Sequence, residues 1–193
     1  MIRIALESDV PAMLAIYGPY VENTTVSFEY EVPPEAEFLR RFQTITAQFP
    51  WLVWEEEGRV LGYAYAAAPF ERAAYRWCAE PSIYLLPEVR GRGIAVKLYA
   101  AMEAVLELQG YQVLYSLITE ENLPSVRFHE KCGYRICMTL PACGFKFGRW
   151  LGLHWMEKRL NFVGSPSSFP VSWASIVQDA ERFTNILDSL SLS

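Results

Sequence analysis

Hydrophobic and polar positions alternate with a period that changes several times along the chain, and each period predicts an element. A short apolar strand at residues 3–6 precedes a helix that begins after Ser8-Asp9, and a second helix begins after Pro33-Pro34. Because Gly18-Pro19 lies within the first helical pattern, we expect that helix to end or kink there. The second helix has an apolar stripe formed by Phe38, Leu39, Phe42, Ile45 and Phe49.

The period then shortens to that of β-strands. Runs at residues 51–54 and 60–65 flank a turn near Gly58 and predict a hairpin. A further strand covers residues 78–86, where Pro81 predicts an edge, an end or a bulge. After it the pattern predicts a helix over 94–109 closed by Gly110, a strand over 113–118, a short helix over 125–131, a turn at 132–134 and a last strand over 152–160. This order predicts a mixed α/β fold around one central sheet.

The composition shifts after this last strand. Residues 164–170 are rich in glycine, serine and proline, and apolar residues then recur at helical spacing from Trp173 to Leu190. We therefore predict a domain over residues 1–160, a linker over 161–170 and an amphipathic C-terminal helix over 171–193. The polar face of that helix is not basic, so we expect it to pack on the domain or on a partner subunit rather than on a membrane.

Composition and charge limit the partners of the chain. Its 193 residues are 52% hydrophobic and 20% charged, which is typical of a folded domain and excludes a disordered chain. The net charge of −5 gives no long-range attraction to nucleic acid or anionic lipid, so any anion site must be local. No apolar run reaches the ~18 residues that span a bilayer, and the N-terminus lacks the pattern of a secretion signal. We therefore expect a cytoplasmic protein that binds neither nucleic acid nor a membrane.

The cysteine pattern does not predict a metal site. The four cysteines, Cys78, Cys132, Cys137 and Cys143, form no Cys-x-x-Cys pair, and the chain has only two histidines. We expect four reduced, mostly buried thiols and no bound metal.

The segment over residues 82–98 carries the clearest chemistry. A predicted strand leads into a loop of glycines and arginines that opens a helix, and glycines let a ligand approach the main chain closely. The first amides of a helix have no internal partner and its dipole favours negative charge there, while Arg90, Arg92 and Lys97 add cations. The segment therefore predicts a phosphate or pyrophosphate site. It lacks the Gly-Lys-Ser/Thr of a P-loop and has Val96 where a dinucleotide fingerprint has its third glycine, and an ordinary glycine-rich turn with solvated arginines is the alternative.

Two sequence blocks resemble the signatures of the GNAT N-acetyltransferases. Arg90-x-x-Gly93-x-Ala95 resembles their acetyl-CoA loop, and the block from Asn122 through Ser125 and His129 to Tyr134 resembles their second signature. Within the family, the chain is similar to the phosphinothricin and methionine sulfoximine acetyltransferases at residues 24–28, 75–80, 124–130 and 144–150. The resemblance covers about residues 1–160 and implies a GNAT domain: a mixed, mostly antiparallel sheet splayed between two parallel strands and flanked by helices, here with an extra C-terminal helix.

The resemblance implies acetyl-CoA as co-substrate and assigns the residues that bind it. The pantetheine arm would pair with the main chain of Ile83, Tyr84 and Leu85, and Asn122 would hydrogen-bond the same arm. The pyrophosphate would lie on the main-chain amides of Gly91, Arg92, Gly93, Ile94, Ala95 and Val96.

It also implies the catalytic residues. Glu80 matches the glutamate that acts as a base, which the reaction needs because a protonated amine cannot attack a thioester, and burial would raise its pKa. Without the resemblance, Glu80 would be interpreted as a solvated residue before a strand. His129 lies where many members have a tyrosine that protonates the leaving thiolate; it is either that acid or a structural helix residue, with water as the other proton source.

For the acceptor, Phe28, Arg72 and Tyr75 match positions that line the substrate site of these relatives. A guanidinium such as Arg72 can hold an α-carboxylate in a bidentate manner, although a solvated loop arginine is the alternative, and Glu71 adds a negative charge beside it.

We therefore expect direct transfer of an acetyl group from acetyl-CoA to the amine of a small, amino-acid-like molecule in a ternary complex, by a homodimeric enzyme. A main-chain amide of the strand that contains Tyr84 would stabilise the oxyanion, and no acyl-cysteine intermediate is expected. The alternatives are a non-catalytic acyl-CoA sensor and a protein or peptide N-acetyltransferase.

Overall fold

The computed structural model describes residues 1–160, 164–166 and 168–178. The helices are α1 (Val10–Asn23), α2 (Glu35–Thr46), α3 (Ile94–Gln109), α4 (Leu123–Lys131) and α5 (Trp173–Gln178). The strands are β1 (Ile2–Ile4), β2 (Trp51–Glu56), β3 (Arg59–Ala67), β4 (Cys78–Leu85), β5 (Val113–Thr119), β6 (Arg135–Lys146) and β7 (Arg149–Arg159).

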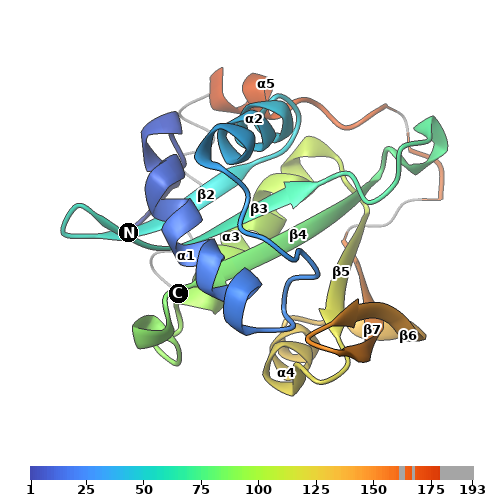
Figure 1. The fold of residues 1–193 in the computed structure, drawn as a ribbon. Coiled ribbons are helices and arrows are strands. Elements are labelled where there is room, and N and C mark those ends of the chain that lie inside the picture. The colour runs from blue at the N-terminus through green and yellow to red at the C-terminus, as the bar shows by residue number, and fades with distance from the viewer. Residues whose placement is uncertain (161–163, 167, 179–193) are drawn as a thin grey trace.

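The strands form one sheet in the order β1-β2-β3-β4-β5-β7-β6, with β4 and β5 as the parallel neighbours and antiparallel pairing elsewhere. The pairing of β4 with β5 is limited to Cys78 with Val113 and Ala79 with Leu114. Beyond these residues the two strands diverge (Figure 1). The predicted mixed sheet, splayed between two parallel strands, is therefore confirmed.

Two apolar clusters hold the layers together. On one face, α1 and α2 cover the sheet: Met13 of α1 and Phe42 of α2 share a cluster with Trp51 of β2, and all three are at most 5% exposed. On the other face, α3 contributes Leu98 and Met102, which are fully buried. Figure 1 shows α1 and α2 in front of the sheet and α3 behind it. The splayed strands are thus held between two independently packed layers.

One predicted helix end, at a proline, and one predicted strand start differ from the structure. Helix α1 does not end at Gly18-Pro19 but continues to Asn23, because a proline removes only one helical hydrogen bond and the apolar face continues on both sides of it through Tyr17 and Val21. Strand β7 begins at Arg149, before the predicted 152, because a two-residue turn at Phe147-Gly148 pairs Lys146 with Arg149.

Pro81 lies in β4, a strand at the centre of the sheet, which a proline normally excludes. The N–H and C=O of one strand residue point to the same side, and the Pro81 carbonyl accepts a hydrogen bond from Ser116 Oγ of β5 at 3.4 Å. An N–H at position 81 would therefore point to the side of β4 where the pairing with β5 has already ended, so its absence in Pro81 costs no hydrogen bond between strands. The strand is central in order but an edge at this residue.

The end of the described chain packs on the main cluster. Trp173 and Ile176 are 4% and 5% exposed, and the Val171 amide donates to the Gln109 carbonyl at 2.8 Å. Most of the predicted C-terminal helix, residues 179–193, lies outside the described residues, as do 161–163 and 167 of the predicted linker. In the described part, no helix is long and apolar enough to cross a membrane.

The thiols differ from the prediction. All four cysteines are free, but Cys137 and Cys143 are exposed and Cys78 and Cys132 are half-buried. The prediction of mostly buried thiols is wrong because β6 is an edge strand with solvent on most of its positions.

We expect Trp173→Ala to lower the free energy of unfolding by about 3–5 kcal/mol, because the indole is buried in the main cluster and its removal leaves a cavity. Urea unfolding followed by circular dichroism would measure the loss. The neighbouring change Ala174→Ser, at an exposed position, should stay within about 0.5 kcal/mol. Equal effects of the two changes would contradict the packing of this segment on the domain.

Candidate active site

The separation of β4 from β5 opens a continuous groove. Three adjoining cavities of about 60, 420 and 440 Å³ share lining residues: Ile83 and Asn122 lie in both the first and the second, and Leu85 and Gly91 in both the second and the third. The groove therefore runs from the point of separation, along β4, to the loop that precedes α3.

At the far end of the groove, the loop before α3 presents main-chain amides. Gly91 and Gly93 have φ angles of +78° and +80°, and a Cβ added to either would meet no atom within 4 Å. The amide of Lys97 donates to the Gly93 carbonyl at 3.2 Å, so the amides of residues 94–96 precede the first bond of the helix. An anion can thus reach unpaired N–H groups over an open surface.

Arg90 and Arg92 of this loop each form hydrogen bonds to one neighbouring side chain. Arg90 donates to the Tyr20 hydroxyl at 2.9 Å, and its guanidinium carbon lies 5.3 Å from the centroid of that ring. Arg92 donates to both carboxylate oxygens of Glu56, at 2.8 and 2.9 Å. These contacts hold two cations beside the helix N-terminus, in a chain that is acidic overall.

Along the groove, β4 presents main-chain groups without a strand to bond. In an antiparallel pair, every second residue of a strand bonds to its partner strand, and the residues between point the other way. The carbonyls of Pro81 and Leu85 point away from β3. The N–H and C=O of Ile83, which lies midway between them, therefore also point away from β3. The Tyr20 hydroxyl donates to the Leu85 carbonyl at 2.6 Å and accepts from its amide at 3.3 Å. Ile83 has no such partner on β5, because that pairing ends at Ala79.

The opposite wall carries polar side chains. Asn122 caps α4 by accepting from the Ser125 amide at 3.3 Å, and it lines the groove. Thr119 of β5 is 2% exposed, and its hydroxyl has no hydrogen-bond partner within the described residues. A buried hydroxyl without a partner, facing an unpaired strand, fits a ligand with amide groups such as the pantetheine arm of a coenzyme. The residues present therefore fit a ligand such as acetyl-CoA, which carries both a pyrophosphate and an arm with amide groups.

Glu80 lies directly after the last pair that joins β4 to β5. Its side chain is half-buried on the face covered by α1 and α2, because side chains alternate along a strand and Tyr84, four residues on, contacts Tyr17 of α1 with ring centroids 4.9 Å apart. Burial raises the pKa of the Glu80 carboxyl above its ordinary value. A carboxylate of raised pKa at this position can accept a proton.

His129 lies in a buried polar cluster at the same end of the groove. Its Nδ1 is 2.8 Å from the Ser125 carbonyl and therefore carries a hydrogen, which leaves Nε2 as the acceptor for the Tyr99 hydroxyl at 2.9 Å. The Tyr99 oxygen is also 2.8 Å from Ser116 Oγ. Burial lowers the pKa of His129 to about 4, although its bond to Ser125 opposes the shift. The ring is consequently neutral at pH 7.

The three residues predicted to bind the acceptor are not all brought together. Phe28 packs on Gly144 of β6, where an added Cβ would come within 2.4 Å of the ring. Arg72 and Tyr75 line a different cavity of about 470 Å³ with Phe70 and Phe169, at the end of the sheet where β4 begins. Both are exposed, and the Phe70 and Tyr75 rings are tilted to one another with their centroids 4.6 Å apart.

Several groove residues were missed from the sequence. Pro124, Arg127, Phe128 and Lys131 line the cavity of about 440 Å³, and their i, i+3, i+4, i+7 spacing could have shown that they share one face of α4. Tyr20 lines the groove from α1, far away in the chain, and no local pattern indicates it.

Comparison with known proteins agrees with this geometry. The family model described as "Acetyltransferase (GNAT) domain" matches residues 2–155. Phosphinothricin N-acetyltransferase of Alcaligenes faecalis is 36% identical over 163 residues, covering 83% of this chain and 82% of the relative. L-Methionine sulfoximine/L-methionine sulfone acetyltransferase of Pseudomonas aeruginosa is 36% identical over 164 residues, covering 83% and 94%.

A solved structure aligns over a similar span. The crystal structure of a GNAT superfamily phosphinothricin acetyltransferase from Sinorhizobium meliloti, in complex with AcCoA, superposes with a TM-score of 0.81 at 35% identity, covering 89% of this chain and 92% of that one. The chain therefore belongs to the GNAT family of acetyl-CoA-dependent N-acetyltransferases, and within it is similar to the phosphinothricin and methionine sulfoximine acetyltransferases.

Proposed function

We propose that this enzyme acetylates the amine of a small, amino-acid-like substrate by direct attack in a ternary complex. The observation that carries the proposal is the Glu80 carboxylate of raised pKa at the point where β4 and β5 separate. The names of the relatives, phosphinothricin and methionine sulfoximine acetyltransferases, support an amino-acid-like acceptor.

The groove would orient the thioester for this attack. The amides of Gly91 and of residues 92–96 would bind the pyrophosphate, and the main chain from Ile83 to Leu85 would pair with the pantetheine arm beside Asn122. Acetyl-CoA supplies the activated acetyl group. The free N–H of Ile83 would donate to the carbonyl oxygen of the thioester and stabilise the negative charge that develops on it.

Glu80 would act as the base. Its carboxylate takes a proton from the substrate ammonium, directly or through one water, and the freed amine attacks the thioester carbon. A C–N bond forms, the C–S bond breaks, and the products are an amide and coenzyme A. The alternative, transfer through an acetylated cysteine, would need a thiolate. Burial raises the pKa of Cys78, the thiol on this strand, and so keeps it protonated, which favours direct transfer.

Of the two acids left open by the sequence, water is the better proton source for the leaving thiolate. His129 is neutral at pH 7, its Nδ1 hydrogen is held by the Ser125 carbonyl, and its Nε2 accepts from Tyr99. His129 would instead fix the groove wall around Ser125. Arg72 would hold the α-carboxylate of the acceptor at the rim, with Tyr75 beside it and Phe28 on the opposite side.

A homodimer remains a prediction from the resemblance, and oligomeric state would be measured by light scattering.

We expect Glu80→Gln to lower kcat by about 10²–10⁴-fold, because the amide cannot take the proton, while the Kd for coenzyme A is unchanged. Thiol release would be followed over amino acids, methionine sulfoximine, phosphinothricin and short peptides, and calorimetry would give the Kd. In the wild type the acidic limb of kcat against pH should lie above the usual range of a glutamate, since the pKa of Glu80 is raised.

The matched control is Glu35→Gln, an exposed carboxylate at the start of α2. Loss of activity in Cys78→Ala with Glu80→Gln still active would contradict the mechanism. Coenzyme binding without turnover on any amine would favour a sensor, and transfer to peptides alone would favour a peptide acetyltransferase.

We expect His129→Gln to retain most of kcat and to remove part of the acid sensitivity of the fold. The folded-state pKa of His129, about 4, lies below the unfolded value of ~6.5, so the unfolded state binds more protons between them. Wild-type stability should therefore fall as the pH drops from ~6.5 towards 4, and less steeply in His129→Gln. Urea unfolding at several pH values would measure this, and parallel curves for the two proteins would contradict the buried neutral imidazole.

A further inference from the structure

Lys146, at the end of β6, is a buried ammonium outside the proposed catalytic machinery. The residue is 2% exposed, and its Nζ donates to the carbonyls of Val21, Thr24 and Ser27 at 2.7, 2.9 and 2.7 Å. These three acceptors use all three hydrogens of the ammonium. Among the described residues it forms no ion pair with a carboxylate. Burying a charge without an ion pair costs free energy, so we expect the three hydrogen bonds of Lys146 to have a role other than stabilising the fold.

The carbonyls belong to the end of α1 and to the loop that follows it. Val21 lies in the last turn of α1, where carbonyls lack helical partners and the helix dipole attracts a cation. Thr24 and Ser27 lie in the segment over residues 24–28, which we call the acceptor loop. Lys146 thus ties the acceptor loop to both α1 and β6.

The acceptor loop reaches both substrates of the proposed reaction. Val26 lines the groove beside Ile83 and Asn122. Phe28, two residues further along, packs on Gly144 of β6. Any movement of the loop therefore changes the space on both sides of the thioester.

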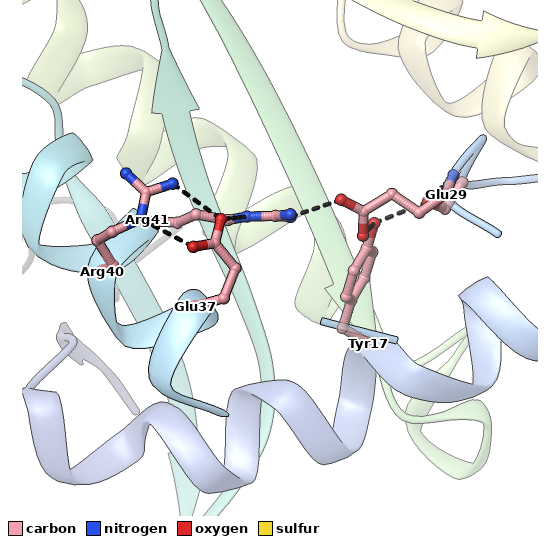
Figure 2. A network of polar contacts seen from close by, with 6 residues as sticks. Tyr17, Glu29, Glu37, Arg40 and Arg41 are labelled. Carbon is pink, nitrogen blue, oxygen red and sulfur yellow. Dashed lines mark hydrogen bonds and ion pairs between the residues drawn. The ribbon is translucent and has the colours of Figure 1, made fainter. Parts of the chain in front are cut away.

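A second set of bonds fixes the main chain next to Phe28. Tyr17 of α1 lies 2.7 Å from Ser27 Oγ and donates to Glu29 at 3.0 Å, and Arg41 of α2 donates to Glu29 at 2.5 Å. Figure 2 shows Glu29 between Tyr17 and Arg41. Phe28 is thus held between two anchored neighbours.

A third contact joins the acceptor loop to the other wall of the groove. Thr25 donates to Glu121 at 2.5 Å, and Arg149 of β7 donates to the same carboxylate at 2.5 and 2.7 Å. Glu121 precedes Asn122, so this contact reaches the wall opposite β4.

We propose that Lys146 is a positioning residue for acetyl transfer: its ammonium holds the acceptor loop at the shape that places Phe28 against the amine substrate and Val26 against the pantetheine arm. This inference rests on the proposed function. It separates the pocket for the acceptor, which depends on Lys146, from the pyrophosphate loop, which does not.

The test is Lys146→Met, which keeps the length of the side chain and removes the ammonium. We expect kcat/KM for the acceptor to fall about tenfold or more, chiefly through the KM of the acceptor, because a small displacement of a positioning group is costly. The Kd for coenzyme A should rise by a smaller factor than the acceptor KM, because Val26 lines the groove of the pantetheine arm whereas the pyrophosphate loop does not depend on Lys146. Hydrogen exchange of the amides over residues 24–29 should become faster.

The matched control is Arg3→Met at the far edge of the sheet. Arg3 also donates to a main-chain carbonyl, that of Ile4 at 3.0 Å, and it pairs with Asp9 and Glu55. Its loss should lower the melting temperature and leave both the acceptor KM and the exchange over 24–29 unchanged. If Lys146→Met behaves like Arg3→Met, Lys146 is only structural and the inference fails.

Should Lys146→Met not fold, Tyr17→Phe removes the hydroxyl bonds to Ser27 and Glu29 and keeps the charge of Lys146. We expect the same rise in acceptor KM, of smaller size, and an unchanged acceptor KM would count against the inference. A wild type that acetylates no amine would refute the proposed function itself. A wild-type enzyme that is active, with a Lys146→Met variant of equal acceptor KM, would refute only the positioning role.

Discussion

The short pairing of β4 with β5 is the constraint on which the site depends. Two parallel strands that bond only at residues 78–79 and 113–114 leave the rest of both edges without partners. The free edge of β4 is used in different ways: Pro81 has no N–H to satisfy, Leu85 is bonded by the Tyr20 hydroxyl, and the main chain of Ile83 has no partner on β5. A fully paired sheet would hold the same residues and contain no groove. The placement of Glu80 follows from the same constraint, because it is the first residue beyond the last pair.

An opened sheet must be held open by contacts elsewhere, and here they are polar as well as apolar. Helix α3 packs under the separated strands with fully buried side chains such as Leu98 and Met102. On the other face the splayed end is bridged by the acceptor loop, through Lys146 on β6 and through Thr25 and Glu121. Apolar packing fixes the distance between the layers, whereas directional bonds fix the position of a loop that has few buried side chains of its own.

How much could be predicted from the sequence depends on the range of the interaction. The hairpin at Gly58 and the cap at Gly110 rest on local φ angles of +75° and +97°, and both were predicted. The predicted end of the first helix at Pro19 was wrong, because contacts distant in the chain hold the apolar face on both sides of that proline. Pro81 was predicted at an edge, an end or a bulge, and it lies at an edge because β5 has separated from β4 there. The glycine turn before α3 could be predicted because its main-chain geometry is local, while Tyr20 and Lys146 act on residues far away in sequence. Arg72 and Phe28 were assigned by resemblance alone, and no spacing rule could show that Arg72 lines a cavity at the start of β4 while Phe28 packs on Gly144.

The same unpaired groups that build the site also link ligand binding to the stability of the fold. A buried hydroxyl or main-chain amide without a partner costs free energy comparable to a lost hydrogen bond, and this structure places Thr119 Oγ1 and the Ile83 main chain together on facing walls. Residues of one groove wall that satisfied each other would close the sheet and abolish the site. The unpaired state is tolerable because the layers around it are well packed, and a ligand that supplies the missing partners stabilises the folded form in proportion to its affinity. In this fold, the groups that could bind a ligand are therefore those left without hydrogen-bond partners, and the packing of the surrounding layers keeps them unpaired.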